Sequence, residues 1–243
     1  MADSPAVHRI AQNRRQPLNS LGHLAVCKVV CVVPQISSPD ELVSRAALLA
    51  ERGTRTLLGL SGAPGAGKST VAALLAAALG DRCAMVPMDG FHLAQDELVR
   101  LGRADRKGAI DTFDGYGFVA LLRRLARADE PIVYAPTFRR DLEEPIAGSI
   151  GVPASVPLVI TEGNYLLFDV APWTDVRGLL HEVWFIRPED DVRRERLVAR
   201  HVAFGRSPAA ARAWALGTDE RNAELVVASA HKADLIVTVA GTT

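Results

Sequence analysis

The residues Gly62-Ala63-Pro64-Gly65-Ala66-Gly67-Lys68-Ser69 match the phosphate-binding P-loop pattern, and they decide the fold of this chain. Glycines let backbone N–H groups turn inward around a phosphate, the lysine reaches the β- and γ-phosphates, and the serine hydroxyl is a ligand for Mg²⁺. Apolar residues 56–60 precede the loop and helix-forming residues 70–79 follow it, as the motif requires. The helix directs its positive dipole end at the phosphates. We therefore expect residues 62–69 and Thr70 to bind a nucleoside triphosphate.

The length and charge of the chain limit its organisation and partners. It has 243 residues, of which 49% are hydrophobic and 23% are charged, which suits one globular domain with a sizeable core. The 28 Lys and Arg residues balance the 28 Asp and Glu residues, so no overall field attracts nucleic acid or an anionic membrane. We expect a small-molecule partner, and the sequence leaves open whether the chain acts alone or as a homodimer.

The cysteines and the longest apolar run indicate the compartment. Cys27, Cys31 and Cys83 contain no Cys-x-x-Cys pair, so they support neither a disulfide framework nor a zinc site. Residues 24–34 are interrupted by Lys28 and reach only about half the length that spans a bilayer. These features favour a cytoplasmic protein.

Strand and helix signals alternate after an N-terminal arm. Residues 1–36 lack clear periodicity and are interpreted either as a flexible arm or as a source of one added strand at 25–33, whereas 37–243 form a single domain. Ser38 is a predicted N-cap for a helix over 40–52. Further strand or helix signals cover residues 84–88, 93–101, 116–128, 131–134, 158–161, 182–186, 190–204, 208–229 and 235–239.

This alternation predicts an α/β fold in three layers, with a mainly parallel sheet between helices. Residues 102–115 and 138–157 are rich in turn-forming residues and read as excursions from the sheet. Because ligands in open α/β sheets lie beyond the carboxyl ends of the strands, we expect these excursions to form walls of a pocket.

Two acids follow predicted strands at the end that faces the P-loop. Asp89 can orient a hydroxyl nucleophile, accept its proton and lie near Mg²⁺. Glu162 occupies the place of the acid that steadies Mg²⁺, so Ser69, Glu162 and Asp89 are the expected metal-site residues. The alternatives are a capping aspartate before Gly90 and an ordinary solvated glutamate.

Arginines along residues 190–204 suggest a lid over the nucleotide. Arg196 and Arg200 are four residues apart and share one helix face. Guanidinium groups match phosphate charge, so we expect Arg196 to act in catalysis and Arg200 to bind the nucleotide. In the alternative interpretation, the arginines of this helix pair with nearby acids.

The polar residues near Asp89 are candidates for binding a small acceptor. Lys107, Asp111 and Phe113 supply a donor, an acceptor and an aromatic face, and His92 follows Asp89 by three residues. The structural alternatives are a satisfied histidine and an aspartate-rich turn that caps the following helix.

Several motifs of the chain, taken in their order along the sequence, resemble those of the phosphoribulokinase/uridine kinase superfamily, including type I pantothenate kinases. The motifs are the P-loop, Met88-Asp89-Gly90-Phe91, Lys107-Gly108 with Asp111-Thr112-Phe113-Asp114, Ala135-Pro136-Thr137-Phe138, Glu162-Gly163-Asn164 and Arg196 with Arg200. The resemblance covers residues 57–239. It implies a nucleoside-kinase-like fold with a helical lid.

The resemblance also implies an enzyme that uses ATP and Mg²⁺ to phosphorylate a hydroxyl of a nucleoside-like, pantothenate-like or sugar-like metabolite. Asp89 and Lys68 would be catalytic, and Glu162 would support the metal. Uridine kinase proper is the first alternative, although Ala109 stands where uridine kinases carry a base-reading histidine. Uridine kinases also carry an acid just after the aromatic residue, where this chain has Arg139-Arg140. This basic pair is a candidate for binding an acidic acceptor, such as a carboxylate or an already phosphorylated substrate, and Arg139 is the residue of the pair that we expect to bind it.

Two other classes of P-loop protein remain as alternatives. A regulatory GTPase would need an Asn-Lys-x-Asp guanine-reading motif, which does not occur. A nucleic-acid-processing module is disfavoured by the neutral charge balance and by the lack of aromatic and basic clusters.

Overall fold

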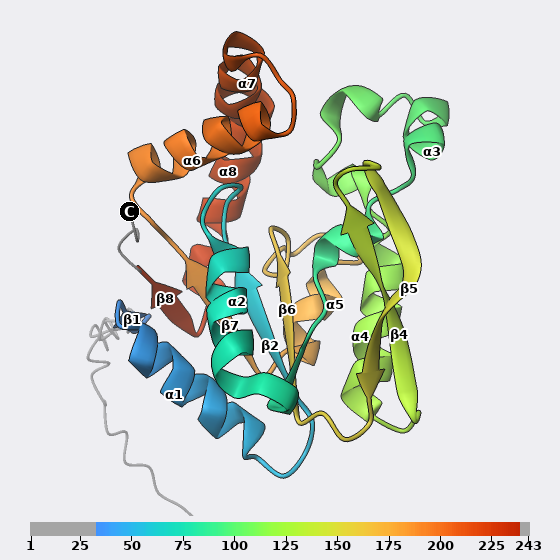
Figure 1. The fold of residues 1–243 in the computed structure, drawn as a ribbon, viewed down its shortest axis with the longest axis vertical. Helices are drawn as coiled ribbons and strands as arrows, with labels where there is room; N and C mark the ends of the chain where they lie inside the picture. Colours follow the sequence, from blue (N-terminus) through green and yellow to red (C-terminus); the bar gives the residue numbers. More distant parts are fainter. Residues whose placement is uncertain (1–32, 239–243) are drawn as a thin grey trace, which may run out of the picture. The chain divides into compact units, whose positions relative to one another are not determined.

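The apolar runs around the P-loop form a six-stranded parallel sheet in the computed structural model (Figure 1). The structure describes residues 33–238. The strands, in spatial order, are β1 (Gln35–Ile36), β8 (Leu235–Val237), β7 (Glu182–Ile186), β2 (Thr56–Ser61), β6 (Leu158–Gly163) and β3 (Cys83–Met85). Every neighbouring pair is parallel, which confirms the predicted sheet. The interpretations of residues 1–32, including most of the added strand at 25–33, lie outside the described residues.

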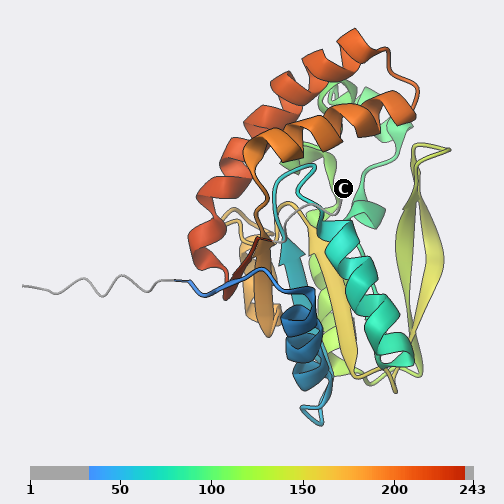
Figure 2. The ribbon, with the colours of Figure 1, turned by 60° about the vertical axis from the view of Figure 1, so that its left-hand side comes forward.

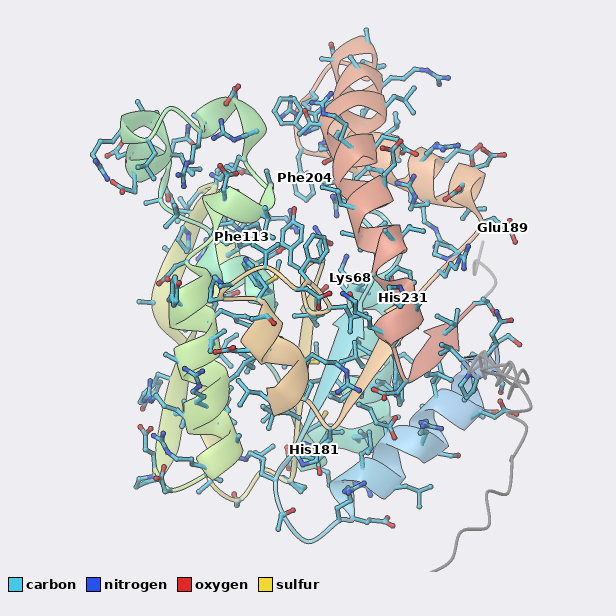
Figure 3. The ribbon with its side chains drawn as sticks, turned by 180° about the vertical axis from the view of Figure 1, so that it is seen from behind. Lys68, Phe113, His181, Glu189, Phe204 and His231 are labelled. Atoms are coloured by element: carbon cyan, nitrogen blue, oxygen red, sulfur yellow. The ribbon has the colours of Figure 1, made fainter. Side chains whose placement is uncertain are left out.

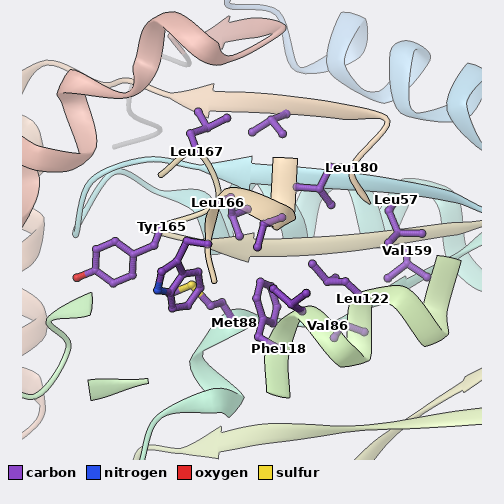
Figure 4. Close-up of a cluster of buried hydrophobic side chains, with 14 of the residues drawn as sticks. Leu57, Val86, Met88, Phe118, Leu122, Val159, Tyr165, Leu166, Leu167 and Leu180 are labelled. Atoms are coloured by element: carbon purple, nitrogen blue, oxygen red, sulfur yellow. The ribbon is translucent and has the colours of Figure 1, made fainter. Parts of the chain in front are cut away.

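Helices cover both faces of this sheet, so the three-layer α/β prediction is confirmed. One face packs against α1 (Pro39–Ala50) and α2 (Lys68–Leu79), and the other packs against α4 (Gly115–Arg127) and α5 (Thr174–Leu179). Successive side chains of a strand point to opposite faces, and Leu57 accordingly joins one core cluster while Leu58 joins the other. Figure 4 shows the cluster that contains Leu57.

Polar caps start two of these helices as the sequence indicates. The Ser38 hydroxyl accepts a hydrogen bond from the Glu41 N–H at 3.5 Å, at the start of α1. The Asp114 carboxylate accepts one from the Gly117 N–H at 2.8 Å, at the start of α4. The helix-capping alternative for the aspartate-rich turn therefore holds at Asp114.

The strand predicted at residues 131–134 does not belong to the central sheet, so the predicted alternation of central strands and helices is wrong at this point. It begins β4 (Ile132–Arg139), which pairs antiparallel with β5 (Glu144–Pro153) in a separate hairpin (Figure 2). Only four residues connect β4 to β5, and so short a connection permits antiparallel pairing alone. Buried Arg55 anchors the base of the hairpin by donating to the carbonyl oxygens of Val156 and Pro153.

The C-terminal helices differ from the predicted single helix over 208–229. After α6 (Asp190–Ala203) come α7 (Pro208–Trp214), a π-helical turn at Ala215–Asp219 and α8 (Glu220–Ala228). We call α6, α7 and this turn the lid. The lid and α3 (Gln95–Arg100) lie beyond the carboxyl ends of the strands in Figure 1. Across residues 33–238, no helix combines the length and the apolar character needed to cross a membrane.

Candidate active site

The P-loop connects β2 to α2 in a conformation that glycine makes accessible. Gly67 caps α2 with a φ of 93°, and Gly65 has a φ of 80°, both in the left-handed region. A Cβ atom on Gly65 would lie 2.7 Å from the carbonyl oxygen of Arg193 in α6. The loop is therefore packed directly beneath the lid, with the left-handed glycines that a P-loop needs to turn its amides toward a phosphate.

Lys68 points back across the P-loop. Its Nζ donates to the carbonyl oxygens of Gly62 at 3.0 Å and Ala63 at 3.2 Å, and to Oδ1 of Asn164 at 2.7 Å. Desolvation lowers the pKa of Lys68, while the nearby charges of Glu162 and Asp89 act in the opposite direction. Asn164 follows the end of β6, and it was not among the predicted site residues although it belongs to the quoted Glu162-Gly163-Asn164 motif.

The predicted acids meet the P-loop at the ends of neighbouring strands. Oγ of Ser69 donates to Oε1 of Glu162 at 2.7 Å. Desolvation raises the pKa of the Glu162 carboxyl, and Lys68 opposes that shift. Asp89 lies in a 3₁₀ turn shortly after β3 and lines the same cleft.

This donor set fits one magnesium ion held mainly by water and phosphate. A serine hydroxyl beside a carboxylate supplies the hard oxygen ligands that Mg²⁺ prefers. Within residues 33–238, no group of three His, Cys, Asp or Glu side chains is placed to hold a metal on its own. Ser69 and Glu162 are the residues that would hold the ion.

Two arginines of α6 pair with an acid, and two others line the cleft, as expected for a lid. Arg193 and Arg194 each donate to Glu220 of α8 at 2.7 Å, so they pair with an acid. Arg196 and Arg200 line the cleft instead. A Cβ atom on Gly67 would lie 3.6 Å from Nη1 of Arg196, so this guanidinium reaches the P-loop.

Aromatic rings form the wall opposite the lid. The ring centroid of His92 lies 4.0 Å from that of Phe113 and 4.7 Å from that of Phe138. Burial lowers the pKa of His92, and its Nδ1 lies 2.7 Å from the Asp89 carbonyl oxygen. Lys107 Nζ lies 5.2 Å from the centroid of the Phe138 ring, close enough for a cation–π contact.

Two predicted acceptor residues lie outside this cleft lining. The Asp111 carboxylate pairs with Arg106 at 2.9 Å, and Arg139 pairs with Asp141 at 2.6 Å. Arg140, the first residue after β4, lines the cleft together with Phe138. Of the predicted basic pair, it is thus Arg140 whose side chain reaches the cleft, while Arg139 pairs with Asp141.

Together these groups line one cleft of about 900 Å³ between the P-loop, the lid and the hairpin, which we call the central cleft. A volume of this order accommodates a nucleotide and a small acceptor side by side. Figure 3 labels Lys68 at its base and Phe113 and Phe204 on the segments that flank it. Most of the predicted site residues line this cleft, and those that do not are Gly62, Ala63, Ala66, Asp111 and Arg139.

This chain is similar in sequence to several known proteins. It is 37% identical over 181 residues to "Putative uridine kinase C227.14" of Schizosaccharomyces pombe, which covers 71% of this chain and 77% of that protein. It is 34% identical over 188 residues to "Uncharacterized protein YggC" of Escherichia coli, with 75% and 77% covered. No family model matches the chain.

A solved structure extends the likeness to the whole fold. The "putative fructose transport system kinase from Silicibacter sp. TM1040" superimposes with a TM-score of 0.73 at 37% sequence identity. The alignment covers 83% of this chain and 99% of that one.

Proposed function

This chain belongs to the uridine kinase/phosphoribulokinase-like superfamily of P-loop kinases, and from that premise we propose that it transfers the γ-phosphate of ATP to a hydroxyl of a small metabolite. The observation that carries the proposal is the position of Asp89. Its carboxylate lines the same cleft as Lys68 and the Ser69–Glu162 pair. A proton acceptor beside a phosphate cradle is what hydroxyl phosphorylation requires.

The proposed transfer places the acceptor between Asp89 and the aromatic wall. The hydroxyl oxygen forms a bond to the γ-phosphorus while the bond from that phosphorus to the β,γ-bridging oxygen breaks, and Asp89 takes the hydroxyl proton. Lys68, Arg196 and Arg200 face the phosphates and balance their charge. Catalysis is then mostly positioning and charge neutralisation.

Ser69 and Glu162 would hold Mg²⁺ in this scheme. The ion supplies charge neutralisation to the phosphate oxygens when it is bound. Desolvation raises the pKa of Glu162, and the nearby negative charge of Asp89 adds to this rise. A cation between these acids would relieve that repulsion.

The side chains that line the cleft indicate the kind of acceptor that we propose. The names of the relatives differ, since one is called a uridine kinase and another a fructose transport system kinase. His92, Phe113 and Phe138 offer flat apolar faces, and Lys107 offers a positive charge. A compact polar metabolite suits this wall better than uridine, because Ala109 provides no side-chain partner for a base.

A coupled ADP-release assay tests the proposal. Nucleosides, pantothenate, sugars and sugar phosphates are supplied singly with ATP and Mg²⁺, and acceptor-dependent ADP release is expected with one class. Lys68→Ala serves as the inactive control. ADP release that no acceptor stimulates, or a preference for GTP with no transfer, would favour the regulatory P-loop class instead.

A further inference from the structure

Arg140 lies in the central cleft, where it follows the hairpin strand β4 and contacts both Asp89 and the end of the lid. It follows β4 directly, and its Nη2 donates to Oδ2 of Asp89 at 3.1 Å. Its guanidinium also lies 5.6 Å from the centroid of the Phe204 ring at the end of α6. One side chain from the hairpin therefore contacts both the proposed proton acceptor and the lid.

Most of the hydrogen-bonding capacity of Arg140 is unused. A guanidinium carries five N–H donors, and within residues 33–238 the one to Asp89 is its single hydrogen bond. The side chain is 43% exposed and lines the cleft. Arg139 differs in both respects, since two of its nitrogens donate to Asp141 and it does not line the cleft.

The other charges at this end of the cleft already have partners. Lys107 donates to the Glu143 carbonyl oxygen at 2.5 Å and lies 3.7 Å from the Glu143 carboxylate. The Glu144 carboxylate accepts the Gln95 N–H at 3.0 Å and 3.2 Å. Within residues 33–238, Arg140 thus keeps more N–H donors for an incoming group than Lys107 does.

We propose that Arg140 recognises an anionic group on the acceptor, a carboxylate or a phosphate, and that without acceptor it restrains Asp89. The planar guanidinium matches either anion through two parallel hydrogen bonds. The hydrogen bond from Arg140 occupies Oδ2 of Asp89, so this oxygen is engaged and not free to accept from an acceptor hydroxyl. When an acceptor anion takes over Arg140, Asp89 is released for the acceptor hydroxyl. Water, which carries no such anion, leaves the restraint in place.

The contact with Phe204 places the anion site under the lid. A cation–π contact holds the hairpin tip against the end of α6. An acceptor bound at Arg140 consequently lies where lid and hairpin meet. This inference rests on the proposed function for its role in transfer, but the anion site itself can be measured without any turnover.

Anion binding is the first test, with the P-loop filled by a non-hydrolysable ATP analogue and Mg²⁺. Inorganic phosphate and acetate are titrated separately by calorimetry into wild type, Arg140→Gln and Arg139→Gln. We expect at least one anion to bind wild type and to bind Arg140→Gln about tenfold more weakly, as the loss of charged hydrogen bonds implies. Arg139→Gln should match wild type. The stronger anion identifies the acceptor group.

Acceptor-free ATP hydrolysis is the second test. Arg140→Gln should hydrolyse ATP several-fold faster than wild type, and the charge-retaining Arg140→Lys should fall between the two, while Arg139→Gln should stay near the wild-type rate. Paired acceptors, gluconate against glucose and fructose 6-phosphate against fructose, should show a raised KM for the anionic member alone in Arg140→Gln.

The outcomes separate the two proposals. Absence of anion binding to wild type, or equal binding and equal hydrolysis by the Arg140→Gln and Arg139→Gln variants, overturns the role of Arg140. If anion binding depends on Arg140 but no acceptor stimulates ADP release, the anion site stands and the proposed kinase reaction is wrong.

Discussion

The ammonium nitrogen of Lys68 lies 2.7 Å from the side-chain oxygen of Asn164, so the residue that reaches the phosphates is held by the end of β6. The remaining partners of this ammonium are two P-loop carbonyl oxygens. Asn164 therefore fixes the direction of Lys68 from outside the loop, which a loop motif read by itself does not reveal.

Asn164→Ala should lower kcat/KM for ATP by about tenfold, because a partly buried charged hydrogen bond is lost and Lys68 is less well oriented. Asn164→Asp should lower it further, since a carboxylate there pairs with Lys68 and repels the triphosphate. Steady-state kinetics with varied ATP measures both changes. Thermal unfolding serves as the control for folding. An Asn164→Ala enzyme with wild-type kinetics would show that Lys68 needs no support from β6.

Gly65→Ala should be more destabilising than Gly53→Ala, although the two positions share a φ of about 80°. Each alanine suffers left-handed backbone strain of about 1 kcal/mol. At Gly65 the added carbon would also lie 2.7 Å from the Arg193 carbonyl oxygen, whereas at Gly53 it meets nothing within 4 Å. We expect an extra loss of about 1–3 kcal/mol from this overpacking. Urea unfolding measures the difference, and equal losses would contradict the packing of the loop beneath α6.

Much of the fold follows from local sequence. The P-loop fixes a strand, a turn and a helix in order, and short apolar runs rich in branched residues, such as the start of Leu158–Gly163, favour buried parallel strands. The acids at their ends, Asp89 and Glu162, then lie at the same edge of the sheet. These inferences need no long-range information.

The hairpin and the division of the C-terminal helix could not be predicted in the same way. Pairing of β4 with β5 depends on contacts such as Val133 with Val152, and prolines interrupt the alternation that would announce the strands. Arg139 is the last paired residue of β4, and Arg140, in the turn that follows, is the one that lines the cleft. The π-helical turn at Ala215–Asp219 has no local signal, and its Asp219 contacts His201 of α6 at 2.7 Å.

Glu162→Gln should stabilise the ligand-free protein increasingly as the pH rises. Desolvation raises the pKa of this carboxyl in the folded state. The folded wild type therefore loses stability as the pH rises from about 4.5, the ordinary pKa of a glutamate, through the raised pKa of Glu162. The Glu162→Gln variant shows no such loss, because its amide carries no charge at any of these pH values. Denaturant unfolding between pH 4 and 8 measures this. The variant should also lose stabilisation by Mg²⁺. A stability difference that is constant with pH would contradict the assignment.

Glu220→Gln should show the opposite dependence on pH. Hydrogen bonds from Arg194 and then Arg193 lower the pKa of Glu220, so its contribution to stability is present above about pH 4.5 and is lost as the pH falls through the lowered value. Arg193 is only 3% exposed, and removing its charged partner should destabilise the protein by about 3 kcal/mol near neutral pH. The same unfolding series measures this loss, which should shrink in acid. A loss that persists unchanged at low pH would mean that packing, rather than charge, joins α6 to α8.

Asp89→Asn should abolish transfer while sparing ATP affinity, because the amide keeps the shape of the side chain and cannot accept a proton. A positioned general base contributes about 10² to 10⁴ in rate, so single-turnover transfer should fall by that range while the nucleotide Kd changes by less than about twofold. The hydrogen bond from Arg140 to Asp89 adds a sharper expectation. If Arg140 acts by restraining this carboxylate, the faster ATP hydrolysis of Arg140→Gln should disappear in the double variant, since two residues in contact do not act additively. Near-wild-type transfer by Asp89→Asn would instead mean that another group takes the proton.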